Sequence, residues 1–220
     1  MSGFLEKLIA WMPSLLRASW VTLSLTVTSV SVALIGGVFL ALGKISKPPA
    51  LRSFCSAYIF FFRGTPLLIQ LYFIYYGLPM IHSSLVIHSA YLAAFVAFSL
   101  NVAAYLAEII RAAIQSIDKG QMEASRALGL TYAQAMRLVI IPQSYRRMIP
   151  PICNEFVMVL KDTSLVSIIA LMDLTNQSNI LATRNTTPLV YIPAMILYLV
   201  MTGAFTAIFN RLEKKLSAYE

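Results

Sequence analysis

Charged and amide side chains interrupt stretches of this sequence that are otherwise apolar. The run from Lys161 to Ser164 places a cation, a carboxylate and two hydroxyls side by side, and Asn101 and Glu108 lie seven residues apart. Charges in an apolar medium are costly, so they are expected to pair with one another or to face a polar cavity. The chemistry open to these groups is therefore ion pairing or the binding of a small polar solute.

Motifs for catalysis were not found in the sequence. It has no glycine-rich phosphate loop of the GxxxxGK type, no metal-ligand spacing and no Ser/His/Asp arrangement. His82 and His88 have no carboxylate nearby, and Cys55 and Cys153 lie in apolar contexts typical of packing residues. We therefore expect no enzyme activity, no metal site and no cofactor in this chain.

The composition indicates an integral membrane protein. The chain has 220 residues, of which 59% are hydrophobic and 12% charged, whereas a soluble domain is about 25% charged. Residues 18–43, 64–107 and 185–210 contain no Asp, Glu, Lys or Arg. A helix that crosses a lipid bilayer needs roughly 20 mostly apolar residues, so each run can cross at least once.

The distribution of basic residues predicts the orientation. Twelve Lys and Arg fall in 44–52, 111–147 and 211–215, against three in the segments on the opposite side. Basic residues concentrate on the cytoplasmic side of membrane proteins, which places the N-terminus outside and the C-terminus inside. The basic residues are distributed between the apolar runs, and this distribution argues against nucleic-acid binding as the reason for the net charge of +8.

These observations predict an all-α polytopic membrane protein, a single domain over 1–220 with five transmembrane helices. The expected helices cover about 16–43, 54–77, 89–112, 148–172 and 188–210, with a cytoplasmic loop at 113–147 and a short amphipathic segment at 1–14 on the outer surface. Pro66 predicts a kink or an unwound turn in the second helix, where Arg63 and Gln70 would share a face. In the third helix, Asn101, Tyr105 and Glu108 form one polar stripe, and Arg111 can pair with Glu108.

The longest polar interval, from Asp118 to Pro142, is expected to form two short helices with a sharp break. Asp118 with Gln121, and Thr131 with Gln134, have the spacing of reciprocal N-terminal caps. Gly129 would end the first helix in a left-handed conformation, and Pro142 would stop the second.

This interval also carries a family resemblance. Glu123, Ala124, Ser125, Gly129 and Pro142, with Val139 and Ile141, resemble the EAA signature of the membrane subunits of bacterial ATP-binding-cassette (ABC) importers. Ser125, Val139 and Ile141 depart from it conservatively. Further stretches resemble the polar amino-acid uptake branch of that family, namely 62–67, 101–105, 119–121 and 161–165.

The resemblance implies the type I ABC importer permease fold in a bacterial cytoplasmic membrane. Two permease subunits, identical or related, would pair in the lipid bilayer, and each would dock its EAA loop on a cytoplasmic ATPase subunit. The ATPase dimer would bind ATP and Mg, and an extracytoplasmic binding protein would deliver the amino acid. The implied coupling residues are Glu123, Ala124, Ser125, Gly129 and Pro142.

The polar residues within the expected membrane helices are candidates for substrate contact, because an amino acid carries both a carboxylate and an ammonium. They are Lys161, Asp162, Thr163, Ser164, Asn101, Gln70, Glu108 and Arg63. Interhelical hydrogen bonding is an equally good explanation for several of them, and a structural ion pair is the better one for Glu108. An ion-coupled secondary transporter is the alternative function, but the sequence has no paired internal repeat.

Overall fold

The computed structural model describes residues 2–217, and every regular element in that range is helical, which confirms the all-helical part of the predicted fold class. The α-helices are α1 (Ser2–Ile45), α2 (Pro49–Gly64), α3 (Leu67–Tyr72), α4 (Leu78–Ile81), α5 (Ala90–Gln115), α6 (Lys119–Ala127), α7 (Tyr132–Ala135), α8 (Ile141–Asp162), α9 (Leu174–Arg184) and α10 (Tyr191–Ser217). π-helical turns occupy Phe73–Gly77 and Met136–Ile140, and 3₁₀ turns occupy Ser83–Leu85, Thr163–Ile169 and Pro188–Val190.

Helix α5 is the centre of the molecule and packs most extensively against α1. Small residues on its inner face are fully buried, among them Ala97, Ala104 and Ala107. On α1, a Cβ placed at Gly37 would stand 2.9 Å from the Cβ of Leu106. Helices that lack a hydrophobic driving force between them associate through such small residues, so the missing side chain at Gly37 lets α1 approach α5 closely.

The first helix begins much earlier than expected. Residues 1–14 were predicted to form a separate surface segment, whereas from Ser2 onward they belong to the 44-residue helix α1. Trp11 and Leu15 are buried in a cluster with Leu174 and Val190 from the region around α9. Packing against that region explains why the helix continues through Pro13, where the local sequence favours a break.

Within the described part of the chain, three helical stretches are long and apolar enough to cross a membrane: Glu6–Ile45, Ala90–Gln115 and Pro188–Lys215. The pair Pro49–Gly64 and Leu67–Ile81 counts as a fourth if the bent pair is one crossing. Helix α8 does not meet the same test, and it carries Arg146, Arg147, Glu155, Lys161 and Asp162.

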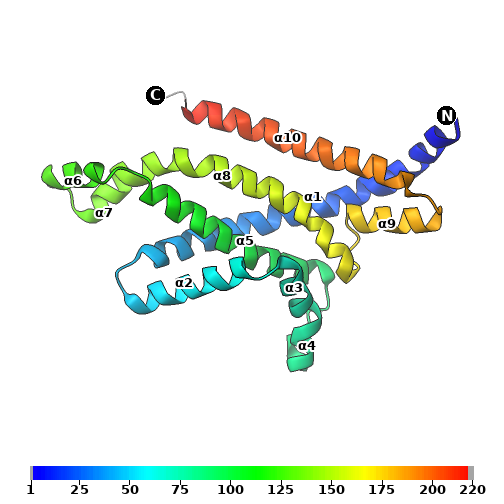
Figure 1. The fold of residues 1–220 in the computed structure, drawn as a ribbon, viewed down its shortest axis with the longest axis horizontal. Coiled ribbons are helices and arrows are strands. Elements are labelled where there is room, and N and C mark those ends of the chain that lie inside the picture. The colour runs from blue at the N-terminus through cyan, green and yellow to red at the C-terminus, as the bar shows by residue number, and fades with distance from the viewer. Residues whose placement is uncertain (1, 218–220) are drawn as a thin grey trace.

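The elongated molecule has two distinct ends (Figure 1). The α6–α7 segment, the turn between α1 and α2 and the end of α10 lie together at the left, while the N-terminus and α9 lie at the right. The basic segments 44–52, 111–147 and 211–215 therefore gather at one end of the bundle. This arrangement matches the charge asymmetry of the sequence.

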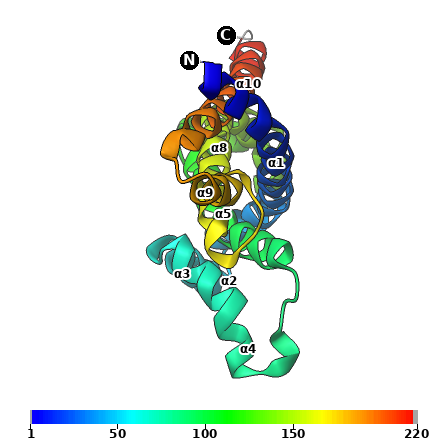
Figure 2. The ribbon, with the colours of Figure 1, turned by 90° about the vertical axis from the view of Figure 1, so that its right-hand side faces the viewer.

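The second apolar stretch is broken rather than gently kinked. Helix α2 and the helical stretch Leu67–Ile81, which begins with α3, meet at 102° across Thr65 and Pro66. Figure 2 shows the resulting arm, α3 and α4, projecting away from the bundle of α1, α5, α8 and α10. The bend puts Arg63 and Gln70 in different surroundings, so the prediction that they share a face is wrong.

Candidate functional site

The segment from Asp118 to Ala135 forms the expected helix, break and helix. Asp118 Oδ1 accepts from the Gly120 N–H at 2.7 Å and caps α6. Gly129 adopts φ +86° in the left-handed region. The Gly129 N–H donates to the Arg126 carbonyl at 3.0 Å and the Leu130 N–H to the Ser125 carbonyl at 3.1 Å, the pair of bonds that defines a Schellman motif. The predicted role of Gly129 in ending α6 is confirmed.

The second cap is also confirmed. The Thr131 hydroxyl accepts from the Gln134 N–H, and Gln134 Oε1 accepts from the Thr131 N–H at 2.8 Å. Gln121, predicted as the reciprocal partner of Asp118, instead accepts from Gln143 Nε2 at 3.2 Å. That bond connects α6 to α8, and it reflects a tertiary contact that outweighs the local cap.

Pro142 does not stop the second helix, contrary to expectation. Helix α7 runs without interruption through the π-helical turn Met136–Ile140 into α8, and Pro142 lies in the first turn of α8. A proline is tolerated at a helix start because the N–H it lacks would have no partner there. The π-helical turn directly precedes Pro142, so Pro142 occupies the first turn of α8 although the run of helix is continuous.

Exposure separates the predicted coupling residues into two groups. Glu123 and Ala124 are exposed on α6, whereas Ser125 is 5% exposed and its hydroxyl donates to the Gln121 carbonyl at 2.6 Å. Sequence reasoning overlooked two apolar residues beside them. Leu128 is 85% exposed and Tyr132 53% exposed. Their positions on either side of Gly129 could have indicated in the sequence that both are exposed at the break. The outer surface of this elbow, residues 119–134, therefore combines a carboxylate with apolar side chains.

Two of the candidate membrane residues, Gln70 and Asn101, meet at the bend between α2 and α3. Asn101 Nδ2 donates to the Phe62 carbonyl and to Gln70 Oε1, both at 2.9 Å. Gln70 Nε2 lies 3.0 Å from the Phe62 carbonyl and 3.1 Å from that of Thr65. The last carbonyls of a helix lack partners within it, and here two buried amides provide them.

Glu108 is held by two cations at the basic end of the bundle. Lys44 Nζ lies 2.9 Å from Glu108 Oε2, and the Arg111 guanidinium contacts Glu108 Oε1. The pairing with Arg111 confirms the predicted ion pair. The contact with Lys44 crosses from α5 to α1 and could not be read from sequence spacing, because 64 residues separate the two partners.

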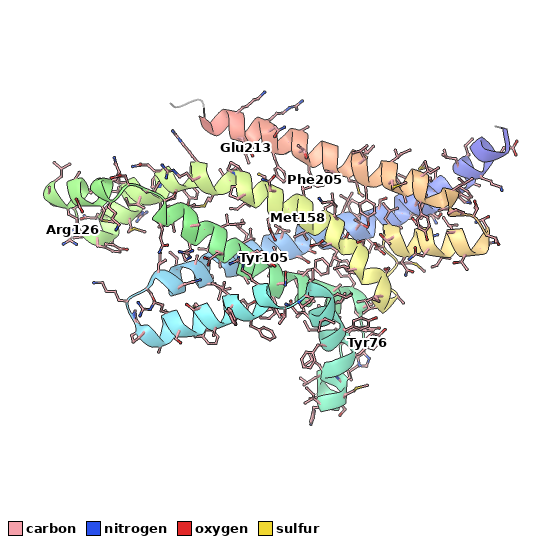
Figure 3. All side chains as sticks on the ribbon, viewed as in Figure 1. Tyr76, Tyr105, Arg126, Met158, Phe205 and Glu213 are labelled. Carbon is pink, nitrogen blue, oxygen red and sulfur yellow. The ribbon has the colours of Figure 1, made fainter. Side chains whose placement is uncertain are left out.

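Arg63 lies over the ring of Tyr105, 5.3 Å from its centroid. Both line a cleft of about 320 Å³ together with Lys44, Ser56 and Phe60. A guanidinium over an aromatic face is attracted by the negative face of the ring. Figure 3 shows Tyr105 near the middle of the molecule, between the two ends described above.

The run from Lys161 to Ser164 spans the end of α8 and the start of the 3₁₀ turn Thr163–Ile169. Lys161 is exposed, Asp162 and Ser164 are partly buried, and Thr163 is fully buried with its hydroxyl donating to the Leu160 carbonyl at 2.7 Å. Neither Lys161 nor Arg63 forms a salt bridge among residues 2–217. The eight candidates thus lie at four places, and Gln70, Asn101, Glu108 and Thr163 already have structural partners.

Comparisons with known proteins agree with this geometry. A family model described as "Binding-protein-dependent transport system inner membrane component" matches residues 33–218. The "Probable amino-acid permease protein YxeN" of Bacillus subtilis is 39% identical over 96% of this chain and 95% of its own. The "L-cystine transport system permease protein TcyB" of the same organism is 37% identical over 94% and 88%.

Solved structures show the same architecture. A chain in "Crystal structure of an amino acid ABC transporter with histidines" aligns with a TM-score of 0.89 at 39% identity, covering 95% of this chain and 97% of that one. A chain of the MetNI methionine ABC transporter in an inward-facing conformation has a TM-score of 0.77 at 21% identity, with coverage of 93% and 97%, and shares the fold. The chain therefore belongs to the family of binding-protein-dependent transport system inner membrane components and is a permease subunit of an ABC transporter.

Proposed function

We propose that this permease takes up an amino acid through the bacterial cytoplasmic membrane and is driven by a partner ATPase. The single observation that carries the proposal is the elbow at residues 119–134, which presents Glu123 and Leu128 at the basic end of the bundle. An exposed leucine beside a carboxylate on a rigidly capped turn suits burial in a protein groove. Relatives at 37–39% identity with names that state amino-acid or cystine transport support the substrate class.

In the proposed assembly, five transmembrane helices place the N-terminus outside and the C-terminus in the cytoplasm. The fourth crossing is α8 with the following 3₁₀ turn, although it carries more charge than the other four. A second copy of this chain or a related permease completes the pathway. An extracytoplasmic binding protein delivers the amino acid, and a dimer of cytoplasmic ATPase subunits binds ATP and Mg.

We assign substrate contact to those candidates whose polar groups make the fewest hydrogen bonds and ion pairs within the described chain. Lys161, Asp162 and Arg63 offer two cations and a carboxylate that can bind the carboxylate and the ammonium of a zwitterion. Ser164 follows Lys161 and Asp162 in the 3₁₀ turn Thr163–Ile169. Gln70, Asn101, Glu108 and Thr163 would then support the pathway through the hydrogen bonds and ion pairs described above.

The test is reconstitution of the permease with its ATPase subunit and binding protein in proteoliposomes. We expect ATP-dependent uptake of an amino acid, and we expect Glu123→Lys and Leu128→Asp to abolish both uptake and substrate-stimulated ATPase activity. Glu6→Lys is the matched control, because it reverses an exposed charge at the opposite end of the molecule. Uptake that continues without ATP and collapses with an ionophore would contradict the proposal and favour ion coupling.

A further inference from the structure

A cleft of about 750 Å³ opens between α8 and α10 at the basic end of the bundle. Deeper in the bundle the two helices are joined by an aromatic cluster. The ring centroid of Phe156 lies 4.6 Å from that of Phe205 and 5.3 Å from that of Phe209. Figure 3 shows Phe205 and Glu213 in order along α10, with Glu213 nearer the C-terminal end. The cleft lies at the level of Glu213, beyond the aromatic cluster.

The lining of the cleft is amphipathic. Its charged members are Arg146, Arg147 and Lys214, opposed by the single carboxylate Glu213. Its apolar members are Ile117, Pro142, Ile149 and Pro150. Such a lining fits a ligand that combines negative charge with hydrocarbon. A nucleotide or a free metabolite would leave the apolar part of the lining exposed to water.

We propose that this cleft binds the phosphate headgroup of an anionic phospholipid from the cytoplasmic leaflet. The side of the membrane rests on the proposed orientation of the permease. Basic pockets between transmembrane helices on the cytoplasmic side bind lipid phosphates, and each Lys or Arg near the surface strengthens the attraction. The headgroup lies between Arg146 and Lys214, and an acyl chain extends along Ile149 toward the aromatic cluster.

The cleft is connected to the elbow at residues 119–134. Arg147 donates through Nη1 to the Ser116 carbonyl, which precedes α6, and Gln143 in the cleft lining donates to Gln121 on α6. A headgroup held here therefore fixes the start of α8 relative to the elbow. The composition of the lipid bilayer thereby becomes a regulator of coupling between the ATPase and the permease.

The experiment measures lipids retained by the complete importer after purification in detergent. Native mass spectrometry of complexes exposed to phosphatidylglycerol or phosphatidylcholine gives the affinity for each. We expect a preference for phosphatidylglycerol, reduced about 25-fold in the double variant Arg146→Gln with Lys214→Gln, or about fivefold for each cation removed. Glu213→Gln removes the opposing carboxylate and should increase retention of phosphatidylglycerol about fivefold. Misfolding would not produce such an increase.

Arg137→Gln is the matched control, because Arg137 is an exposed cation at the same end that does not line the cleft. The proposal is overturned if the control loses as much lipid as the double variant, or if Glu213→Gln leaves retention unchanged. Displacement of phosphatidylglycerol by millimolar inorganic phosphate would show a free-anion site, and lipid retention that appears only after the ATPase subunit is removed from the importer would show a protein interface. Either result also overturns it. These outcomes are independent of ATP-driven uptake in proteoliposomes, whose absence in every lipid mixture would refute the proposed function instead.

Discussion

Asn101 on α5 donates its side-chain amide to the carbonyl of Phe62 at the end of α2, at 2.9 Å. Gln70 donates to the same carbonyl from α3. Thr65 contributes as well, since its hydroxyl donates to the Phe61 carbonyl at 2.8 Å. Helix α2 therefore ends with its carbonyls bonded to side chains, and the 102° bend is a stabilised feature rather than a point of disorder.

Removal of either amide should destabilise the bend. We expect Asn101→Leu and Gln70→Leu each to lower the free energy of unfolding by about 1–3 kcal/mol, because each leaves a buried carbonyl or amide without a partner. The double variant should lose less than the sum, since both side chains serve one network. Thermal unfolding of the detergent-solubilised permease measures the changes. Ser99→Ala on α5 is the control and should be nearly neutral, because the buried Ser99 hydroxyl has no hydrogen-bond partner among residues 2–217.

Substitution at Gly129 should separate backbone conformation from side-chain chemistry. At φ +86° a β-branched residue is strained, so Gly129→Val should cost about 1–2 kcal/mol locally and uncouple ATP hydrolysis from uptake. Gly129→Asn should retain most coupling, because asparagine adopts the left-handed conformation more readily. Apart from the two neighbouring residues in the chain, no atom of the described residues 2–217 lies within 4 Å of a Cβ placed there, so a steric clash within the subunit does not affect the comparison. Equal loss of uptake in both variants would mean that side-chain size at a docking surface is decisive.

Neutralisation of Glu108 should affect stability rather than substrate affinity. Glu108→Gln leaves Lys44 and Arg111 close together without their shared carboxylate, so the apparent Tm should fall more than in Lys44→Gln. The groups are partly solvated, which limits the effect to about 1 kcal/mol. The KM for uptake should stay unchanged in proteoliposomes. A large rise in KM with an unchanged Tm would instead identify Glu108 as a substrate ligand.

Close packing of α1 on α5 predicts an asymmetry between glycines. Gly37→Ala should lower the free energy of unfolding by about 1–3 kcal/mol, because its Cβ would lie 2.9 Å from Leu106 and 3.2 Å from the Ala103 carbonyl. A Cβ at Gly203 on α10 would meet no other segment of residues 2–217 within 4 Å, so Gly203→Ala should be neutral or stabilising by up to about 1 kcal/mol, since alanine favours the helix. Thermal unfolding of the two variants side by side makes the comparison.

Structural features that depend only on residues close together in the sequence could be predicted from local sequence patterns. The cap at Thr131, the left-handed Gly129 and the Glu108–Arg111 pair each depend on at most four consecutive residues, and the all-helical class follows from the long apolar runs. Contacts between distant segments could not be predicted in this way. The Lys44–Glu108 bridge, the Gln121–Gln143 bond and the burial of Trp11 each depend on packing that brings separate helices together. The sequence indicated a break at Pro66, but the side-chain bond from Asn101 to the end of α2 comes from another helix.

The uninterrupted passage from α7 through the π turn into α8 has a mechanical consequence. Residues 132–162 form one helical lever whose length is about 46 Å at the usual rise per residue. A tilt of about 10° at the elbow would displace the far end, at Lys161 and Asp162, by about 8 Å if the lever were rigid. Pro150 and Pro151 lie near its middle and are where bending concentrates. The displacement of Lys161 and Asp162 therefore depends on how far the helix bends at these two prolines as well as on the movement of the elbow.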